Sequence, residues 1–322
     1  MNSAPIRIEL PTPFAVGPVN CFLLLDPEPT LIDCGMKIEM NQTALKAGLA
    51  QHGLTIADLK RIVITHAHVD HMGMAAWLCE QSDAMVWVSD LVEPWARDIE
   101  TMWNRRIRIY RPILNKIGLD ETMQKGIVGY MRSVPNHWDS IPDERLMIFD
   151  HEGELEMGGM SWEVLHLPGH TIHQSGFYQR EMGWLISADC LLHRTPVPIL
   201  EHNPDNPTER NIGFPIHLQS LNRINRLDIQ IAFPGHGKLI HDHRALIAKQ
   251  FARIEQRKSE CEMLIKAGNH TLPVITDVMY GHYPPSAKFT GLSTILGYTD
   301  LLIAEGKIEQ VEKNGIWHYF PV

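Results

Sequence analysis

The sequence predicts an α/β protein, and three observations lead to this class. Short apolar runs typical of strands alternate with stretches of helical periodicity through the first 240 residues. Hydrophobic residues make up 44% of the 322 residues and charged residues 21%, a composition typical of a globular chain. No apolar run approaches the roughly 18 residues that a membrane span requires.

Charge and cysteine content narrow the class further. The 29 lysine and arginine residues face 38 aspartate and glutamate residues, and the net charge of −9 disfavours a general nucleic-acid or membrane-surface binder. The N-terminus lacks the basic start and apolar core of a secretory signal. Five cysteines without a Cys-x-x-Cys pair favour a reducing compartment, so we expect a cytoplasmic protein. The 18 histidines are the unusual feature, because histidine is the commonest metal ligand.

Residues 1–240 are expected to form one large domain of alternating strands and helices. Apolar runs predict strands over 21–25, 30–33, 61–65, 84–88, 162–167, 176–178, 184–187 and 229–233, and helical spacing predicts helices over 39–50, 73–81 and 216–227.

Residues 94–145 interrupt that order with a predicted helical insertion. Pro94 suits a helix start, Gly118 a helix end and Asp120 the cap of a second helix. Large apolar side chains recur every three or four residues, and such a stripe has to be buried. We expect it either to cover the active edge as a lid or to dock on a second copy in a homodimer. As a lid, the insertion would bring three side chains to the substrate: Trp103, Arg106 and Tyr110.

Residues 241–322 are expected to form a second, winged-helix-like domain. Helical patterns over 243–267, 271–281 and 286–305 precede two short strands about an Asn314-Gly315 turn, a strong hairpin signal. From residue 246 onward, eight basic residues balance eight acidic ones, whereas a DNA-reading wing is normally basic. We therefore favour a packing or dimer role over nucleic-acid binding.

The chemistry is concentrated in the segment that follows the strand at 61–65. His66, His68, Asp70 and His71 place four metal-capable side chains within six residues. His66 and His68 can point to the same side of an extended backbone, and Asp70 and His71 follow as the chain turns into a helix. One loop can therefore offer two ligands to each of two adjacent metal ions.

Three later segments supply further ligands, each at the end of a predicted strand. They are Pro-Gly-His170-Thr, Ser-Ala-Asp189 and Pro-Gly-His236-Gly. Gly-His turns let the backbone and an imidazole approach a site closely. Imidazoles and carboxylates suit zinc, although such ligands leave iron and manganese as alternatives.

Five motifs, taken in their order along the chain, resemble those of the metallo-β-lactamase superfamily. They are an early Leu-Ile-Asp33-Cys-Gly, then His-x-His-x-Asp-His, Pro-Gly-His-Thr, Ser-Ala-Asp and Pro-Gly-His-Gly. The resemblance covers residues 15–240 and implies an αβ/βα sandwich with the site at one edge. It assigns His66, His68 and His170 to a first metal ion. It assigns Asp70, His71 and His236 to a second, with Asp189 bridging both and Asp33 orienting a ligand.

Departures from the family pattern disfavour some of its subfamilies. A cysteine ligand of the true β-lactamases is replaced here by Asp189, so antibiotic cleavage is not the expected task. The lactonase tyrosine position holds Leu192, which weakens that alternative. The tail resembles the small C-terminal domain of a group related to glyoxalase II and the mitochondrial lactamase-like endoribonuclease.

We therefore expect a hydrolase with two zinc ions per chain, with Asp70 and Asp189 as its catalytic carboxylates and a small ester or thioester as substrate. His193, on the loop after Asp189, is a candidate substrate contact. Two alternatives stay open: a phosphodiesterase or endoribonuclease of the same fold, and a non-catalytic binding protein.

Overall fold

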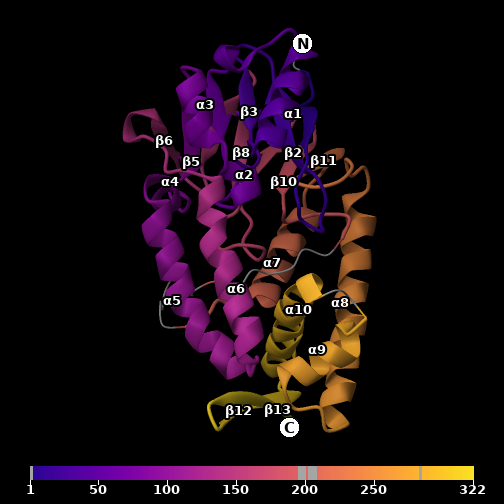
Figure 1. Cartoon of the computed structure of the whole chain (residues 1–322). Helices are drawn as coiled ribbons and strands as arrows, with labels where there is room; N and C mark the ends of the chain where they lie inside the picture. The colour runs from indigo at the N-terminus through magenta and orange to yellow at the C-terminus, as the bar shows by residue number, and fades with distance from the viewer. Residues whose placement is uncertain (1–2, 195–200, 202–208, 283–284) are drawn as a thin grey trace.

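The computed structural model describes residues 3–194, 201, 209–282 and 285–322, and its upper half in Figure 1 contains two β-sheets. The six strands of the first sheet lie in the order β1-β2-β3-β4-β5-β6, and β3 to β6 run parallel. Its strands are β1 (Ile6–Leu10), β2 (Val19–Leu24), β3 (Thr30–Ile32), β4 (Arg61–Val63), β5 (Met85–Ser89) and β6 (Leu146–Phe149).

The second sheet has five strands in the order β11-β10-β9-β8-β7. Neighbouring strands are antiparallel, except that β10 and β11 run parallel. Its strands are β7 (Glu154–Met157), β8 (Met160–His166), β9 (Ser175–Gln179), β10 (Trp184–Ala188) and β11 (Ile231–Pro234).

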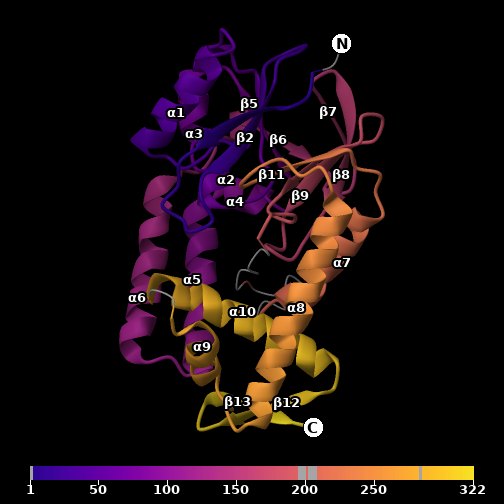
Figure 2. The same ribbon diagram turned by 90° about the vertical axis from the view of Figure 1, so that its right-hand side faces the viewer.

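The two sheets pack face to face, and helices cover their outer faces (Figure 2). Phe22 and Leu24 of β2 meet Phe177 and Trp162 in the core between the sheets, while the alternate side chains of β2 face the helices of the first layer. The helices are α1 (Glu39–Ala50), α2 (Val69–Met72), α3 (Ala75–Gln81) and, beyond the second sheet, α7 (Gly213–Asn225), with a 3-10 turn η1 (Ile56–Asp58). This αβ/βα sandwich is the predicted fold.

The insertion contains three helices, and its predicted hairpin is present. It comprises α4 (Glu93–Arg97), α5 (Ile99–Ile117) and α6 (Glu121–Ser133), followed by 3-10 turns η2 (Val134–His137) and η3 (Asp143–Arg145). Gly118 ends α5 at φ +83°, and the Asp120 carboxylate accepts the Met123 N–H to cap α6. The pattern predicted one helix from 94, whereas the chain breaks at Asp98, which caps α5 instead.

The apolar stripe of the insertion is buried within its own chain. Trp103, Ile107 and Leu114 are at most 9% exposed and belong to one core that continues into the C-terminal helices. The stripe therefore does not require a second copy to cover it, and dimerisation stays a prediction from the sequence.

The C-terminal segment has the predicted order of three helices and a hairpin. These elements are α8 (His243–Lys266), α9 (Leu272–Tyr280), α10 (Pro285–Ala304), β12 (Ile308–Lys313) and β13 (Ile316–Pro321). Asn314 and Gly315 turn the hairpin with positive φ angles of 53° and 78°. In Figure 2, α10 crosses between the insertion and α8. No helix in the described part of the chain is long and apolar enough to cross a membrane.

Candidate metal centre

Seven side chains from four strand ends converge at one edge of the sandwich. Three overlapping groups each bring their ligand atoms within 4.8 Å of one another. The groups are His66, His68 and His170; His66, His71 and Asp189; and Asp70, His71 and His236. The structure thus brings together all seven residues that the sequence nominated as ligands.

The first group consists of three imidazoles. His68 Nδ1 lies 3.1 Å from His66 Nε2 and 3.1 Å from His170 Nε2. Thr65 Oγ1 donates its single proton to the Asp33 carboxylate at 2.8 Å, so it accepts from His66 Nδ1 at 3.0 Å. The lone pair of His66 is therefore on Nε2 and points to the centre of the group.

The second group combines two imidazoles with a carboxylate. His236 Nε2 lies 3.4 Å from Asp70 Oδ2. Asp189 lies between the groups, because its oxygens are 3.6 Å from the Nε2 atoms of His71 and His236 and 3.5 Å from that of His170.

The outer nitrogens of two imidazoles in the second group are held by oxygen acceptors. His71 Nδ1 donates to Asp33 Oδ2 at 2.7 Å, and His236 Nδ1 donates to the Pro18 carbonyl at 2.8 Å. These bonds fix each ring and leave Nε2 facing the site, as metal-binding histidines require. Asp33 also accepts the Thr65 N–H at 2.9 Å and has a positive φ of 58°.

The turn that carries His236 is held by the N-terminal strands. Asn20 Nδ2 donates to the carbonyls of Pro234 and Gly237, both at 2.8 Å. Arg7 Nη1 donates to the same Gly237 carbonyl at 2.8 Å, and Val19 forms an isolated bridge with His236.

Glycines permit the close approach of the ligand turns. A Cβ on Gly235 would lie 2.2 Å from Asp189 Oδ1 and 3.0 Å from His71 Cε1. A Cβ on Gly169, whose φ is +136°, would lie 2.4 Å from His217 Cα. The turn before His170 therefore needs glycine for packing and for backbone conformation, whereas the turn before His236 needs it for packing alone.

Burial and charge act in opposite directions on the ionisable groups. Burial, followed by the neighbouring imidazoles, lowers the pKa of His66 and His68 well below the usual value. Burial would raise the pKa of Asp189, but His236 and His71 outweigh it and lower that pKa. The carboxylates likewise overcome burial and raise the pKa of His71 and His236.

These observations fit a bound cation. His71 Nε2 and Asp189 Oδ1 are buried and have no hydrogen-bond partner among the described residues. Buried acceptors of this kind are costly unless something occupies the space between them. The carboxylates stabilise positive charge here, and imidazole and carboxylate donors together suit a divalent metal.

The other predicted site residues are distributed around this cluster. His193 is exposed, lies beside Gly237 and has its Nε2 3.1 Å from the Lys238 carbonyl. Trp103 donates its indole N–H to the Met131 carbonyl, and Tyr110 is buried in the same core. Arg106 is only 7% exposed and pairs with Glu201. The insertion residues expected to reach the substrate thus have partners within the chain.

The sequence did not single out Tyr130, which comes near the cluster from the insertion. It lies on α6, and its side chain is 57% exposed. Partial burial of the hydroxyl, followed by the charge of Asp70, raises the pKa of that hydroxyl. No periodic signal distinguishes a tyrosine of this kind from other helix-surface residues.

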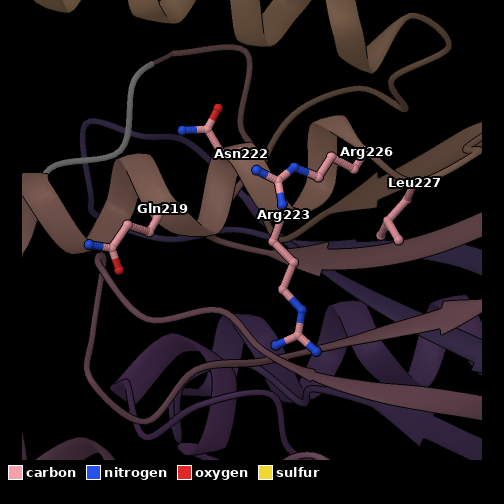
Figure 3. Close-up of a pocket in the computed structure, with 5 residues that line it drawn as sticks. All are labelled: Gln219, Asn222, Arg223, Arg226 and Leu227. Atoms are coloured by element: carbon pink, nitrogen blue, oxygen red, sulfur yellow. The ribbon is translucent and has the colours of Figure 1, made fainter.

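A separate hollow lies along α7 (Figure 3). Its lining residues are Gln219, Asn222, Arg223, Arg226 and Leu227. None of them belongs to the metal cluster, and Arg223 pairs with Glu152 at 3.0 Å.

Comparisons with known proteins agree with this geometry. A family model described as the metallo-β-lactamase superfamily matches residues 15–236. The chain is 27% identical over 304 residues to the probable metallo-hydrolase YqjP of Bacillus subtilis, covering 94% of this chain and 93% of that protein. It is 27% identical over 176 residues to the hydroxyacylglutathione hydrolase GloC of Haemophilus influenzae, covering 53% of this chain and 66% of GloC.

The fold also has solved counterparts. A metallo-β-lactamase family protein from Thermus thermophilus superposes with a TM-score of 0.80 at 23% identity, covering 99% of this chain and 98% of that one. At this identity the likeness bears on the fold alone.

Proposed function

Because the chain belongs to the metallo-β-lactamase superfamily and is a metallo-hydrolase of that superfamily, we propose that it uses two zinc ions to hydrolyse a small ester or thioester. The observation that carries the proposal is the position of Asp189, whose oxygens lie within 3.6 Å of imidazoles from both ligand groups. A carboxylate so placed can serve two ions at once.

The proposed division of the ligands follows two of the three groups in the cluster. His66, His68 and His170 hold one ion, and Asp70, His71 and His236 hold the other. Bound there, two zinc ions supply Lewis acidity and lower the pKa of a bound water to about 7. Asp33 and the Pro18 carbonyl orient the rings of His71 and His236.

Two observations support an acyl substrate. GloC, a relative over about half of this chain, is named a hydroxyacylglutathione hydrolase, which acts on a thioester. The chain carries a net charge of −9, which disfavours a polyanionic substrate such as RNA. In the proposed reaction water adds to the acyl carbon, a C–O bond forms, the C–S or C–O bond to the leaving group breaks, and the leaving group takes a proton.

A substrate panel tests the proposal. Zinc-loaded protein is assayed against thioesters, lactones and aryl esters, and in parallel against bis-aryl phosphodiesters and short RNA. We expect the highest kcat/KM on a thioester or ester. Higher kcat/KM on the phosphodiesters or RNA would reject the acyl assignment and support the phosphodiesterase alternative.

A pair of variants connects the activity to the cluster. Asp189→Ala removes the carboxylate shared by both groups, so we expect at least a hundredfold loss of kcat. His193→Ala serves as the comparison, because His193 is exposed and lies outside the cluster, and its loss is expected to be smaller. Equal losses in both variants would contradict this ranking.

A further inference from the structure

A buried ion pair connects the helical insertion to the segment after Asp189. Arg106 of α5 is 7% exposed, Glu201 is 3% exposed, and Arg106 Nη2 donates to Glu201 Oε1. The guanidinium also lies over the rings of Trp95 and Trp103, 4.8 and 5.2 Å from their centroids. Removing one partner of a charge pair buried this deeply destabilises the fold, because the remaining partner would be a buried, uncompensated charge.

Glu201 also contacts the segment that follows His170. Its Oε2 accepts the Ile172 N–H at 2.8 Å, and its Oε1 lies 3.6 Å from His173 Nε2. The carboxylate therefore joins the insertion to the chain two residues after one of the proposed ligands.

His173 carries the connection on to the first ligand loop. Its Nδ1 accepts the Ala67 N–H, with 3.4 Å between the two nitrogens. Because a backbone N–H can only donate, Nδ1 is unprotonated and the ring proton lies on Nε2, towards Glu201. Burial lowers the pKa of His173 to about 4, which keeps the ring neutral at pH 7. Ala67 is the residue between His66 and His68.

We propose that Glu201 is a positioning residue. Together with Arg106 and His173, it fixes the relative position of two loops, one carrying His66 and His68 and the other carrying His170. The network reaches the loops of all three ligands of the first group. Two rings of the second group have positioning bonds outside this network, since Asp33 holds His71 and the Pro18 carbonyl holds His236. The inference rests on the proposed function and makes it specific: the helical insertion controls the affinity of one metal ion of the two.

Glu201→Gln is the first test. Glutamine keeps the volume and an acceptor for the Ile172 N–H but leaves Arg106 without a charged partner. Zinc is titrated into the metal-free protein against a chromophoric chelator, and the visible spectrum of the cobalt-substituted protein reports the ligand geometry. We expect one ion to bind about 10- to 100-fold more weakly and the other to bind unchanged, with an altered cobalt spectrum.

His173→Phe breaks the same connection at another point. It removes the acceptor for Ala67 while retaining a ring of similar size, so the same single ion is expected to bind more weakly. This variant decides the question if Glu201→Gln does not fold.

Asp300→Asn is the matched control. Asp300 is 7% exposed and accepts a two-point ion pair from Arg210, with Nη1 2.7 Å from Oδ2, so it is also a buried Arg–carboxylate pair. It joins Arg210 to α10, and within the described part of the chain its hydrogen bonds do not reach the ligand loops. We expect lower stability of the metal-free protein and two unchanged zinc affinities.

Each outcome has a distinct meaning. Unchanged zinc affinities and an unchanged cobalt spectrum in a folded network variant would overturn the inference, even if that variant is less stable. Equal weakening of both ions in Glu201→Gln, or weakening of the same single ion in Asp300→Asn, would also overturn it, because the effect would then follow general destabilisation. A wild-type protein that binds no zinc would instead refute the proposed function.

Discussion

Replacing Gly235 by alanine tests the close packing of the metal cluster. Gly235 lies in the turn after β11, and its φ lies outside the left-handed region, so alanine is compatible with the backbone there. The perturbation is therefore steric: the new Cβ would lie 2.2 Å from Asp189 Oδ1 and 3.0 Å from His71 Cε1.

The structure sets the size of the effect. Contacts of a Cβ below 3.0 Å are essentially never seen, so the Asp189 carboxylate has to move from 2.2 Å to at least that distance. The displacement of about 0.8 Å is several times the roughly 0.2 Å by which metal–ligand distances vary. Because misplacements near 1 Å cost about a hundredfold in rate, we expect a loss of that order in kcat and at least tenfold weaker zinc binding.

The assay needs a glycine-to-alanine control. Gly129→Ala is suitable, since Gly129 lies within α6 and a Cβ there would have no atom within 4 Å. This control is expected to stabilise the protein by up to about 1 kcal/mol through helix propensity, with zinc content unchanged. Zinc is measured by elemental analysis after dialysis and by chelator competition. Wild-type zinc affinity and kcat in Gly235→Ala would refute the steric argument.

Three further predictions follow from the site and its surroundings. Asp33→Asn leaves one acceptor oxygen where Thr65 and His71 offer three donors, so we expect zinc binding to be weaker by about 1.5–3 kcal/mol. Chelator competition measures this, and an unchanged zinc affinity would exclude the orienting role of Asp33. Dialysis against a chelator should abolish hydrolysis and lower the melting temperature, and added zinc should restore both. The reason is that a ligand present at a thousand times its Kd adds about 4 kcal/mol to the free energy of unfolding. Activity that survives complete removal of metal would contradict this prediction. Burial lowers the pKa of His217 to about 3. Below about pH 6.5 the unfolded chain therefore binds a proton at this residue that the folded chain does not bind. Between pH 7 and pH 5 this residue alone should lower the free energy of unfolding of the metal-free protein by about 2 kcal/mol. Denaturant unfolding of His217→Leu at both pH values checks this, because the variant should lack that part of the pH dependence.

Features with a local signal could be predicted from the sequence. The Asn314-Gly315 hairpin and the Gly118 helix end depend on backbone conformations that these residues favour. The seven proposed ligands were found for a related reason, since each follows a strand in a short motif. The topology brings strand ends to one edge, so residues far apart in sequence meet there.

Features set by tertiary packing could not be predicted. The break at Asp98 was missed because the apolar spacing continues across it, and only the local hydrogen bond to Thr101 marks the new helix start. The side-chain partners of Arg106 were also missed. Glu201 is 95 residues away, and nothing in either local segment indicates the pairing. The stripe of the insertion likewise finds its partner in helices more than 100 residues later.

The attachment of the His236 turn to the first strands has a consequence for how the protein folds. His236 and the Pro18 carbonyl that holds it are 218 residues apart, and Asn20 and Arg7 make contacts of similar sequence separation. Long loop closures of this kind are slow and form late. During synthesis, the loop with Asp70 and His71 is complete long before its third partner exists. The nascent chain therefore offers only an unfinished site at this position. In the proposed two-zinc protein, the nearly finished fold then selects the second ion, rather than the unfolded chain taking whichever ion it would bind most tightly.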